Sequence, residues 1–257
     1  LAEVFAAERP QVVSHHAAQI DVRKSLEDPA FDACVNVLGS INVLECCVRH
    51  GVEKLIFAST GGAIYGDVDE SHMPVSESYA PRPVSHYGTA KLCVEHYIGL
   101  YGILYGLRYT ILRYPNVYGP RQNPHGEAGV CAILVGLMLD GKTPTLFGFG
   151  EPMRDYVYVG DIARANVLAL ERADGETLNL GSGKGTTVRE IFEGIRELTG
   201  FQGEPDLKPI RPGEVRKIYI TGDRAREVLG WKAEVELKEG LKRTLEHVKA
   251  HRAPAKA

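Results

Sequence analysis

Short apolar segments recur along the first half of the chain and alternate with segments of a longer period. Residues 54–58 and 109–112 are mostly apolar, a pattern typical of strands that are buried on both faces, and residues 11–15 indicate a further short strand that ends at His15. The segments between them place apolar residues every three to four positions, which is the period of an amphipathic helix. Strands and helices that alternate in this way predict a doubly wound α/β fold, in which helices cover both faces of a parallel sheet.

Two long helices in this half have clear start and stop signals. Asp28 can cap the first helix, Pro29 can occupy its first turn, and Gly51 can end it. Ser85 can cap the second helix, and Gly106 lies near its end. We therefore expect one long helix before and one after the second of these strands.

The second half of the chain has a looser pattern. A loop rich in proline and glycine leads into an apolar helix, and a Thr187–Glu190 capping box opens a further helix. We expect a smaller α/β lobe over residues 121–257 beside a first domain at 1–120. Segments near 156–181 are expected to return to that first domain.

The start of the chain departs from this pattern. It begins with a helix that leads into a strand, although in a parallel sheet such a helix is half of a crossover that a strand should precede. The only glycines before the second strand are Gly39 and Gly51, so the sequence has no glycine-rich turn able to hold a pyrophosphate there. We expect that the sequence lacks an amino-terminal part of about 60 residues. A complete protein with a shorter sheet is the alternative.

Composition and charge exclude several other classes of protein. The 257 residues are 44% hydrophobic and 25% charged, which is typical of a globular protein. The formal net charge of −3 gives no positive field that would attract nucleic acid. The longest apolar run, at 130–139, is too short for a membrane span. The five cysteines form no C-x-x-C pair, which favours reduced thiols and a cytoplasmic location.

Tyr87 and Lys91 are the first candidates for catalytic residues, and they lie four positions apart in the second predicted helix. This spacing places the phenol and the ammonium on one face of the helix. A neighbouring positive charge favours the phenolate and so lowers the pKa of the phenol, which makes such a pair a usable general base. The alternative is a surface pair with no chemical role, because this spacing is common by chance.

The strand at 54–58 is followed by the hydroxyl residues Ser59 and Thr60. They lie at the carboxyl end of a parallel strand, where open α/β sheets bind ligands. Either hydroxyl can hold a substrate alcohol while the phenolate takes its proton; the alternative is that it caps the following turn. Neither His15 nor His16 has a partner ligand at a useful spacing, so we expect no metal site.

Five motifs follow one another along the chain. They are S-T-G-G-A-I-Y-G from Ser59, Y-G-T-A-K from Tyr87, L-R-Y-P-N-V-Y-G-P-R from Leu112, R-D-Y-V-Y-V-G-D from Arg154 and R-P-G-E from Arg211. Together they resemble the extended short-chain dehydrogenase/reductase family and, within it, nucleotide-sugar epimerases of the UDP-glucose 4-epimerase type. The resemblance covers essentially the whole chain. It implies a Rossmann-like fold, NAD as the cofactor, a UDP-sugar as the substrate, and epimerisation at C4 through a transient 4-keto sugar.

The resemblance also implies roles for individual residues. Tyr87 would be the acid and base, and Lys91 would lower its pKa and bind the nicotinamide ribose. Thr60 matches the catalytic hydroxyl of the family, while Ser59 stays possible because an extra glycine follows. Further cofactor contacts match His16, Ala17, Ala18, Gln19, Tyr114 and Val117.

The implied substrate contacts lie further along the chain. Asn116 matches a residue that contacts the sugar diphosphate, and Arg154 and Arg211 match arginines that hold it, a bidentate task suited to guanidinium. Glu214 stands where many members of the family have an aspartate that holds the uridine ribose. Ile218 stands where some members carry a bulky tyrosine, so we expect a pocket open to N-acetylhexosamines.

Two departures from the family pattern leave alternatives open. Because the glycine-rich cofactor loop is absent from the sequence, the chain could be a non-catalytic one that has lost cofactor binding. Gly61 and Gly62 follow Thr60 where dehydratases and decarboxylases carry acidic residues, which favours epimerisation. Another enzyme acting on nucleotide sugars, a dehydratase or a reductase, is the second alternative. The family also implies a homodimer that pairs through the helices after Asp28 and Ser85.

Overall fold

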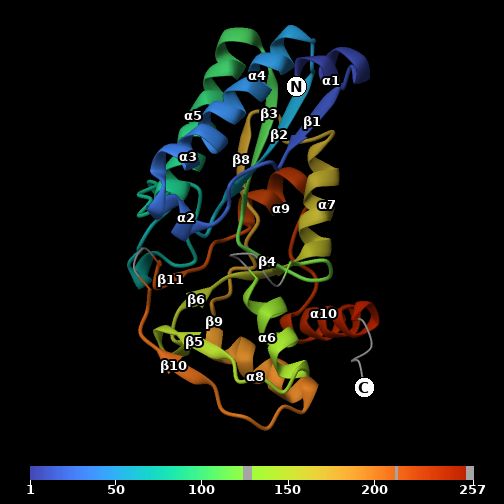
Figure 1. Ribbon diagram of the computed structural model, residues 1–257. Helices are drawn as coiled ribbons and strands as arrows, with labels where there is room; N and C mark the ends of the chain where they lie inside the picture. Colours follow the sequence, from blue (N-terminus) through green and yellow to red (C-terminus); the bar gives the residue numbers. More distant parts are fainter. Residues whose placement is uncertain (124–128, 212–213, 253–257) are drawn as a thin grey trace.

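The computed structural model describes residues 1–123, 129–211 and 214–252. Figure 1 shows two regions, one above the other. The upper region, here called the sheet lobe, is a parallel sheet with helices on both faces. The lower region, here called the small lobe, consists of three helices and several short strands.

Four parallel strands form the central sheet in the order β1, β2, β3, β8. They are β1 (Val12–His15), β2 (Lys54–Thr60), β3 (Arg108–Tyr114) and β8 (Glu176–Asn179). Every residue of β2 is buried, because the sheet is covered on both faces. This coverage explains the apolar runs of β2 and β3, and the three strands predicted near residues 11–15, 54–58 and 109–112 are confirmed.

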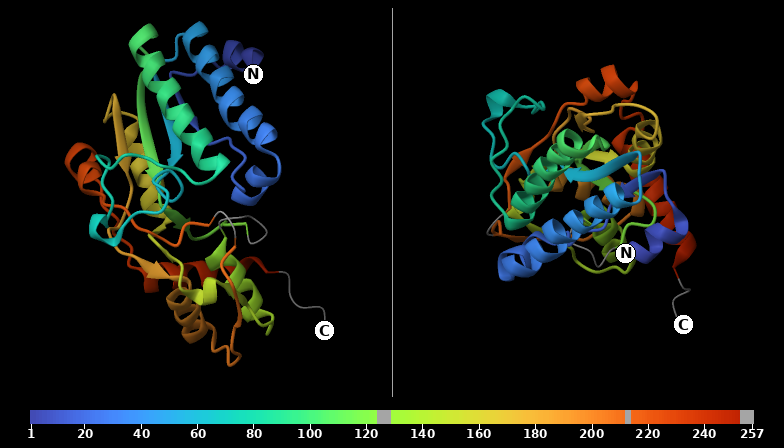
Figure 2. Two further views of the ribbon diagram at one scale, coloured as in Figure 1. Left: turned by 90° about the vertical axis from the view of Figure 1, so that its left-hand side faces the viewer. Right: turned by 90° about the horizontal axis from the view of Figure 1, so that it is seen from above.

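The helices of the first half cover one face of the sheet (Figures 1 and 2). They are α1 (Ala2–Glu8), α2 (Val22–Glu27), α3 (Pro29–Ala33), the π-helix η1 (Cys34–Leu38), α4 (Gly39–Arg49) and α5 (His86–Tyr105). Leu44 of α4 and Val94 and Ile98 of α5 share one apolar core with Leu55 and Phe57 of β2. The two long helices expected here are confirmed, although η1 interrupts the first.

Two features of this face were not predicted. The short helix α2 begins where the Asp21 carboxylate accepts hydrogen bonds from the backbone N–H groups of Arg23 and Lys24. The helical run Pro29–Arg49 is also long and apolar enough to cross a membrane, by length and composition only. In the structure this run packs against α5 and the sheet.

Helices α7 (Val159–Ala169) and α9 (Asp223–Leu229) cover the opposite face. There Ile162, Ala165 and Trp231 share an apolar core with Ile56 and Leu112 of the sheet. Helices on both faces of a parallel sheet confirm the doubly wound α/β fold. Both α7 and β8 return to the sheet lobe from the second half of the chain. Helix α9 also packs on the sheet lobe, although only the segments near residues 156–181 were expected to return to it.

The small lobe is built on α6 (Val130–Leu139), α8 (Val188–Thr199) and α10 (Leu237–His251), which share one apolar core. The expected capping box is confirmed at the start of α8. Two pairs of short strands remain, β4 (Asn116–Tyr118) with β7 (Tyr156–Tyr158) and β5 (Thr145–Phe147) with β10 (Asp206–Lys208). A small three-stranded sheet has β6 (Met153–Arg154) between β9 (Thr186–Thr187) and β11 (Lys217–Ile218). The two 3-10 helices are η2 (Glu70–His72) and η3 (Gly148–Gly150).

Candidate active site

The start of α5 is fixed against the carboxyl end of β2. The Ser85 hydroxyl accepts a hydrogen bond from the backbone N–H of Gly88 at 3.1 Å and so caps the helix. A Cβ atom on Gly88 would lie 2.6 Å from the carbonyl oxygen of Ala63. Only glycine allows this approach, which places Tyr87 in the first turn of α5 beside the loop that follows β2.

Tyr87 and Thr60 approach each other at this point, and the Thr60 hydroxyl acts to lower the pKa of the Tyr87 phenol. Thr60 is 8% exposed, and its hydroxyl also accepts a hydrogen bond from the backbone N–H of Ala63 at 3.2 Å. Burial raises the pKa of Tyr87 to about 12, against the opposing effect of the Thr60 hydrogen bond. The expectation of a lowered phenol pKa is therefore wrong for this structure, because loss of hydration outweighs the favourable contacts.

Lys91 lies one turn further along α5 and is buried. Its Nζ donates to the carbonyl oxygen of Ala58 at 2.9 Å and lies 4.6 Å from the ring centroid of Phe57 and 6.0 Å from that of Tyr87. Burial lowers the pKa of Lys91 to about 8, while the charges of Asp32 and Glu95 act in the opposite direction. The predicted shared helix face is thus present, with the ammonium beneath the phenol.

Ser59 has a different environment from Thr60. Its hydroxyl donates to Oε1 of Glu95 at 2.5 Å, and the guanidinium of Arg113 binds both carboxylate oxygens of Glu95 at 3.0 and 2.6 Å. Arg113 also donates to the hydroxyl of Tyr65 at 2.8 Å. Ser59 therefore belongs to a buried ionic network, and the structure brings Thr60, not Ser59, to the phenol of Tyr87.

The loop after β1 carries four of the expected cofactor contacts, His16 to Gln19. His16 is exposed and donates through Nε2 to the hydroxyl of Tyr114 at 3.0 Å, which in turn donates to Asn166 at 2.9 Å. Ala17 is exposed and Ala18 half-buried. Gln19 is held at both its backbone and its side chain by polar groups of the helices that follow. Val117 packs at the edge of the apolar core beneath α7.

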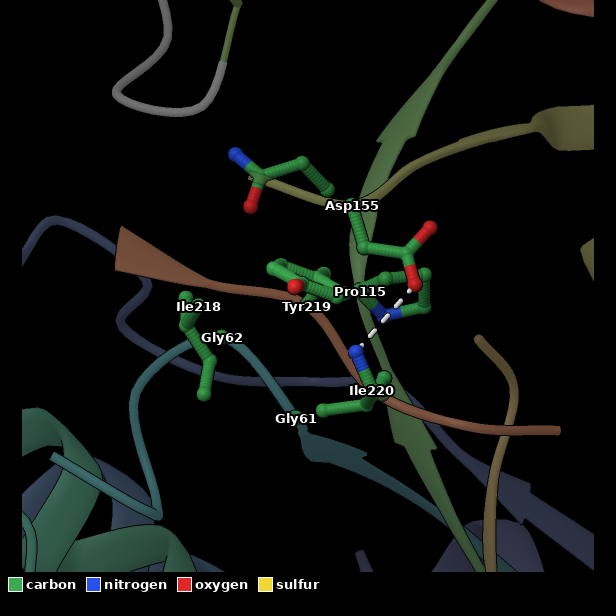
Figure 3. A pocket seen from close by; sticks show the side chains of 8 residues that line it. Gly61, Gly62, Pro115, Asp155, Ile218, Tyr219 and Ile220 are labelled. Atoms are coloured by element: carbon green, nitrogen blue, oxygen red, sulfur yellow. Dashed lines mark hydrogen bonds between the residues drawn. The ribbon is translucent and has the colours of Figure 1, made fainter. Parts of the chain in front are cut away.

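A shallow hollow lies between the two lobes beside the end of β2 (Figure 3). Asn116 and Ile218, both expected at the substrate, line it together with Gly61 and Gly62. A Cβ atom on Gly61 would lie 2.3 Å from Cδ1 of Ile220, so the hollow is narrow at this wall. Its other lining residues are Pro115, Asp155, Tyr219 and Ile220.

Asp155 was not predicted as a site residue, and it joins several segments at this hollow. Its carboxylate accepts hydrogen bonds from the N–H and hydroxyl of Ser182, from the N–H of Gly183 and from the N–H of Ile220; the last is drawn in Figure 3. Burial raises the pKa of Asp155 to about 6, against these hydrogen bonds. Its partners lie 27 to 65 positions away in the sequence, so no local motif could reveal them.

The remaining substrate candidates lie in the small lobe. Arg154 is paired in register with Ile218 and donates to the carbonyl oxygens of Met153 and Arg216 at 2.9 and 3.2 Å. The guanidinium carbon of Arg211 lies 3.4 Å from the ring centroid of Phe147, and its NH1 lies 4.0 Å from Oε1 of Glu214. Arg154 is therefore adjacent to the hollow, whereas Arg211 and Glu214 pair with each other. The two residues between them lie outside the described residues.

Comparison with known proteins agrees with this arrangement. Residues 1–181 match the NAD dependent epimerase/dehydratase family. The chain belongs to this family, which confirms the resemblance stated from the sequence motifs.

Individual relatives narrow the comparison. The chain is 42% identical over 247 residues to the UDP-glucose 4-epimerase of Mycolicibacterium smegmatis, covering 96% of this chain and 78% of that one. The structure is similar to that of a Thermotoga maritima UDP-glucose 4-epimerase with UDP-glucose, with a TM-score of 0.95 and 48% identity over 97% of this chain and 80% of that one. It is also similar to a Thermus thermophilus UDP-glucose 4-epimerase in complex with NAD, with a TM-score of 0.92 and 44% identity over 98% of this chain and 81% of that one.

Proposed function

We propose that this chain catalyses NAD-dependent epimerisation of a UDP-sugar at C4, of the UDP-glucose/UDP-galactose type, through a 4-keto sugar. The observation that carries this proposal is the grouping of Thr60, Tyr87 and Lys91 at the carboxyl end of β2. The similar structures that hold UDP-glucose and NAD support it.

The residues present fit the adenosine and nicotinamide sides of NAD, while the glycine-rich turn that would hold its pyrophosphate is not in this sequence. The loop at the carboxyl end of β1 has small side chains at Ala17 and Ala18, so a ligand can approach its backbone, and His16 and Gln19 would hold the adenosine and ribose side. Tyr114, Val117, Lys91 and Ser59 belong to the part of the sheet edge where the nicotinamide side would lie. When bound, NAD supplies an acceptor and donor of hydride for the sugar C4.

The proton chemistry falls to Tyr87. The Thr60 hydroxyl can bind the 4-hydroxyl of the sugar and direct its proton to the phenol oxygen of Tyr87. Since the pKa of Tyr87 is raised to about 12, its phenolate needs a stabilising cation. Lys91, with a pKa near 8, carries its charge at pH 7 and supplies that stabilisation from one turn away. The same phenol returns the proton when the 4-keto sugar is reduced on its other face.

Substrate recognition is proposed for the hollow and the small lobe. Asn116 would contact the diphosphate, Arg154 and Arg211 would bind its charge, and Glu214 would hold the uridine ribose. Ile218 leaves the hollow without an aromatic ring at that position, so N-acetylated sugars should enter.

Elimination of water, the dehydratase alternative, would need an acid beside the sugar. Asp155 is the carboxyl group that lines the hollow, and both its oxygens accept hydrogen bonds from Ser182, Gly183 and Ile220. Because these bonds use its acceptor capacity for the fold, Asp155 does not supply that acid, and epimerisation remains the reaction that the site supports.

The experiment that tests this function follows the conversion of UDP-galactose to UDP-glucose with added NAD. Tyr87→Phe should keep NAD binding and lower kcat by about a hundredfold or more, and Thr60→Val should also lower kcat. Ser71→Ala, which removes an exposed hydroxyl of η2, should keep turnover. A 4-keto-6-deoxy product would contradict the proposal, as would near-normal kcat in Tyr87→Phe. Turnover of UDP-glucose without turnover of UDP-N-acetylglucosamine would reject the open pocket.

We further propose a cytoplasmic homodimer. Helix α5 presents the apolar residues Leu100, Ile103 and Leu104 to solvent, with Ile103 82% exposed, next to α4. Burial of this face between two copies would remove apolar surface from water. The cysteines are all free, and Cys34 is exposed, a state that persists in a reducing compartment.

A further inference from the structure

Asp32, in α3, is a buried carboxylate that the function described above does not use. It is 1% exposed. Its Oδ1 accepts hydrogen bonds from Nε2 of Gln19 at 2.9 Å and from Nδ2 of Asn36 at 3.0 Å. Its Oδ2 is buried and has no hydrogen-bond partner among the described residues. A buried carboxylate oxygen without a partner costs free energy, and such groups in folded proteins call for a functional explanation.

The two partners of Asp32 hold the loop that follows β1. Asn36 accepts from the backbone N–H of Gln19 at 2.8 Å and donates to its carbonyl oxygen at 3.0 Å. Gln19 also donates to the carbonyl oxygen of Asp21 at 2.8 Å. One carboxylate therefore fixes both side chains that set the course of the loop from His16 to Gln19.

The charge of Asp32 also reaches the residues at the start of α5, because α3 packs against α5. It acts electrostatically on both Tyr87 and Lys91. The other charged group of α5 near Lys91, Glu95, is paired with Arg113. Asp32 is thus a second carboxylate acting on Lys91, and one of its oxygens has no hydrogen-bond partner among the described residues.

We propose that Asp32 is a positioning residue that orders the loop from His16 to Gln19 through its two amide partners and supplies a buried negative charge to the Tyr87–Lys91 pair on the adjacent helix α5. The first role rests on the proposed function, since that loop is expected to bind NAD. The second can be measured in the chain without any reaction.

Several other groups surround the pair and must stay unchanged in a test. The charge of Lys91 acts on His15 and His16 at the end of β1, and Glu95 of α5 acts on Lys91. Helix α2, which packs against both α3 and α5, carries the cations Arg23 and Lys24, and Arg23 lies 3.5 Å from Asp21. Asp32→Asn removes one charge, keeps the shape of the side chain and alters none of these residues.

Removal of the Asp32 charge has a defined sign. A nearby anion favours protonated lysine and protonated tyrosine, so its loss lowers the pKa of Lys91 below about 8 and that of Tyr87 below about 12. The pKa values of both groups therefore fall together. If Asp32 acted only by packing, its replacement would change neither pKa.

The direct test is the titration of Lys91 in protein labelled with ¹³C at the lysine Cε, with Lys91→Arg to identify the signal. Asp32→Asn should lower the midpoint by about one pH unit, and Asp32→Glu, which keeps the charge, should restore it. Asp28→Asn removes a charge from the exposed start of the same helix and keeps a capping side chain, so it should leave the midpoint unchanged. An unchanged midpoint in Asp32→Asn overturns the electrostatic role, whether or not the chain is an epimerase.

The loop role is tested with Asn36→Leu, which leaves the Asp32 charge in place, removes its other amide partner and keeps the test open if Asp32→Asn fails to fold. We expect weaker NAD binding by equilibrium titration, with the Lys91 midpoint unchanged. In active enzyme, Asp32→Asn should shift both limbs of the kcat–pH profile to lower pH. Unaltered NAD affinity in Asn36→Leu overturns the loop role.

Discussion

His15 shows how strongly position alone can change the chemistry of one residue. It ends β1 with its ring enclosed, 7% exposed, and its Nε2 lies 2.9 Å from the hydroxyl of Ser40. Burial lowers the pKa of His15 to about 4, and the charge of Lys91 adds to this effect. The folded protein therefore holds His15 neutral at a pH where an unfolded chain would protonate it.

This pKa shift predicts a pH dependence of stability. Between pH 6.5 and about 4 the unfolded state binds a proton that the folded state does not, so the free energy of unfolding should fall as the pH drops through this range, by about 3 kcal/mol from His15. In His15→Gln the fall should be smaller, measured by urea unfolding at several pH values. The exposed His96 provides the control, since His96→Gln should keep the wild-type slope; an unaltered slope in His15→Gln would contradict the prediction.

The adjacent hydroxyls of Ser59 and Thr60 show the same principle at the site. The sequence alone left both as candidates for the catalytic hydroxyl. In the structure the first donates to Glu95 and the second meets Tyr87. The choice depends on which α5 side chain faces each hydroxyl, and that is a tertiary contact.

At the scale of elements, α5 organises the site. Tyr87, Lys91 and Glu95 follow one another at intervals of four residues, and each contacts the end of β2: at Thr60, at the carbonyl of Ala58 and at Ser59 respectively. Three contacts from successive turns fix the helix against the strand in both rotation and translation. The phenol is therefore placed by the packing of a whole helix.

Two glycines of α5 make this placement testable. Alanine in a helix is normally favoured over glycine by about 1 kcal/mol, but a Cβ on Gly88 would lie 2.6 Å from the Ala63 carbonyl oxygen. Gly88→Ala should therefore destabilise the protein by about 1–3 kcal/mol and lower kcat by displacing Tyr87. A Cβ on Gly99 would meet only the Tyr109 hydroxyl, at 3.9 Å, so Gly99→Ala should raise the melting temperature. Equal effects of the two substitutions in a thermal melt would contradict this account.

Much of the secondary structure was predictable, and the exceptions have local causes. The apolar runs and capping residues identified three strands of the sheet and both long helices. The short helix α2 was missed because its signal is a single cap, Asp21, without an apolar repeat. The place of α9 was missed because a seven-residue helix does not indicate which lobe it covers.

At the scale of the whole molecule, the exposed apolar face of α5 is the feature that calls for a partner. Ile103 and Leu104 are 82% and 60% exposed, near the end of a helix that packs beside α4. If two copies pair through this face, Ile103→Glu should shift the protein from dimer to monomer, because it buries a charge without a partner. Sedimentation velocity over a range of concentrations measures the change.

The matched control lies on the opposite face of the sheet. Val167 of α7 is 64% exposed, so Val167→Glu introduces the same charge at a comparably open position. It should leave the oligomeric state unchanged. Identical sedimentation of Ile103→Glu and the unmodified protein would exclude α5 as the dimer contact.

The sequence by itself determined the class of fold, the helix that carries Tyr87 and Lys91, and the family, because periodicity, capping and motif spacing are local properties of the chain. Only the tertiary structure gave Ser59 and Thr60 different environments, raised the pKa of Tyr87, and revealed Asp32, Glu95 and Asp155. Each of these outcomes depends on burial and on partners from other elements. Loss of hydration and the choice of a hydrogen-bond partner are set by atoms that are distant in sequence and become neighbours only when the chain folds.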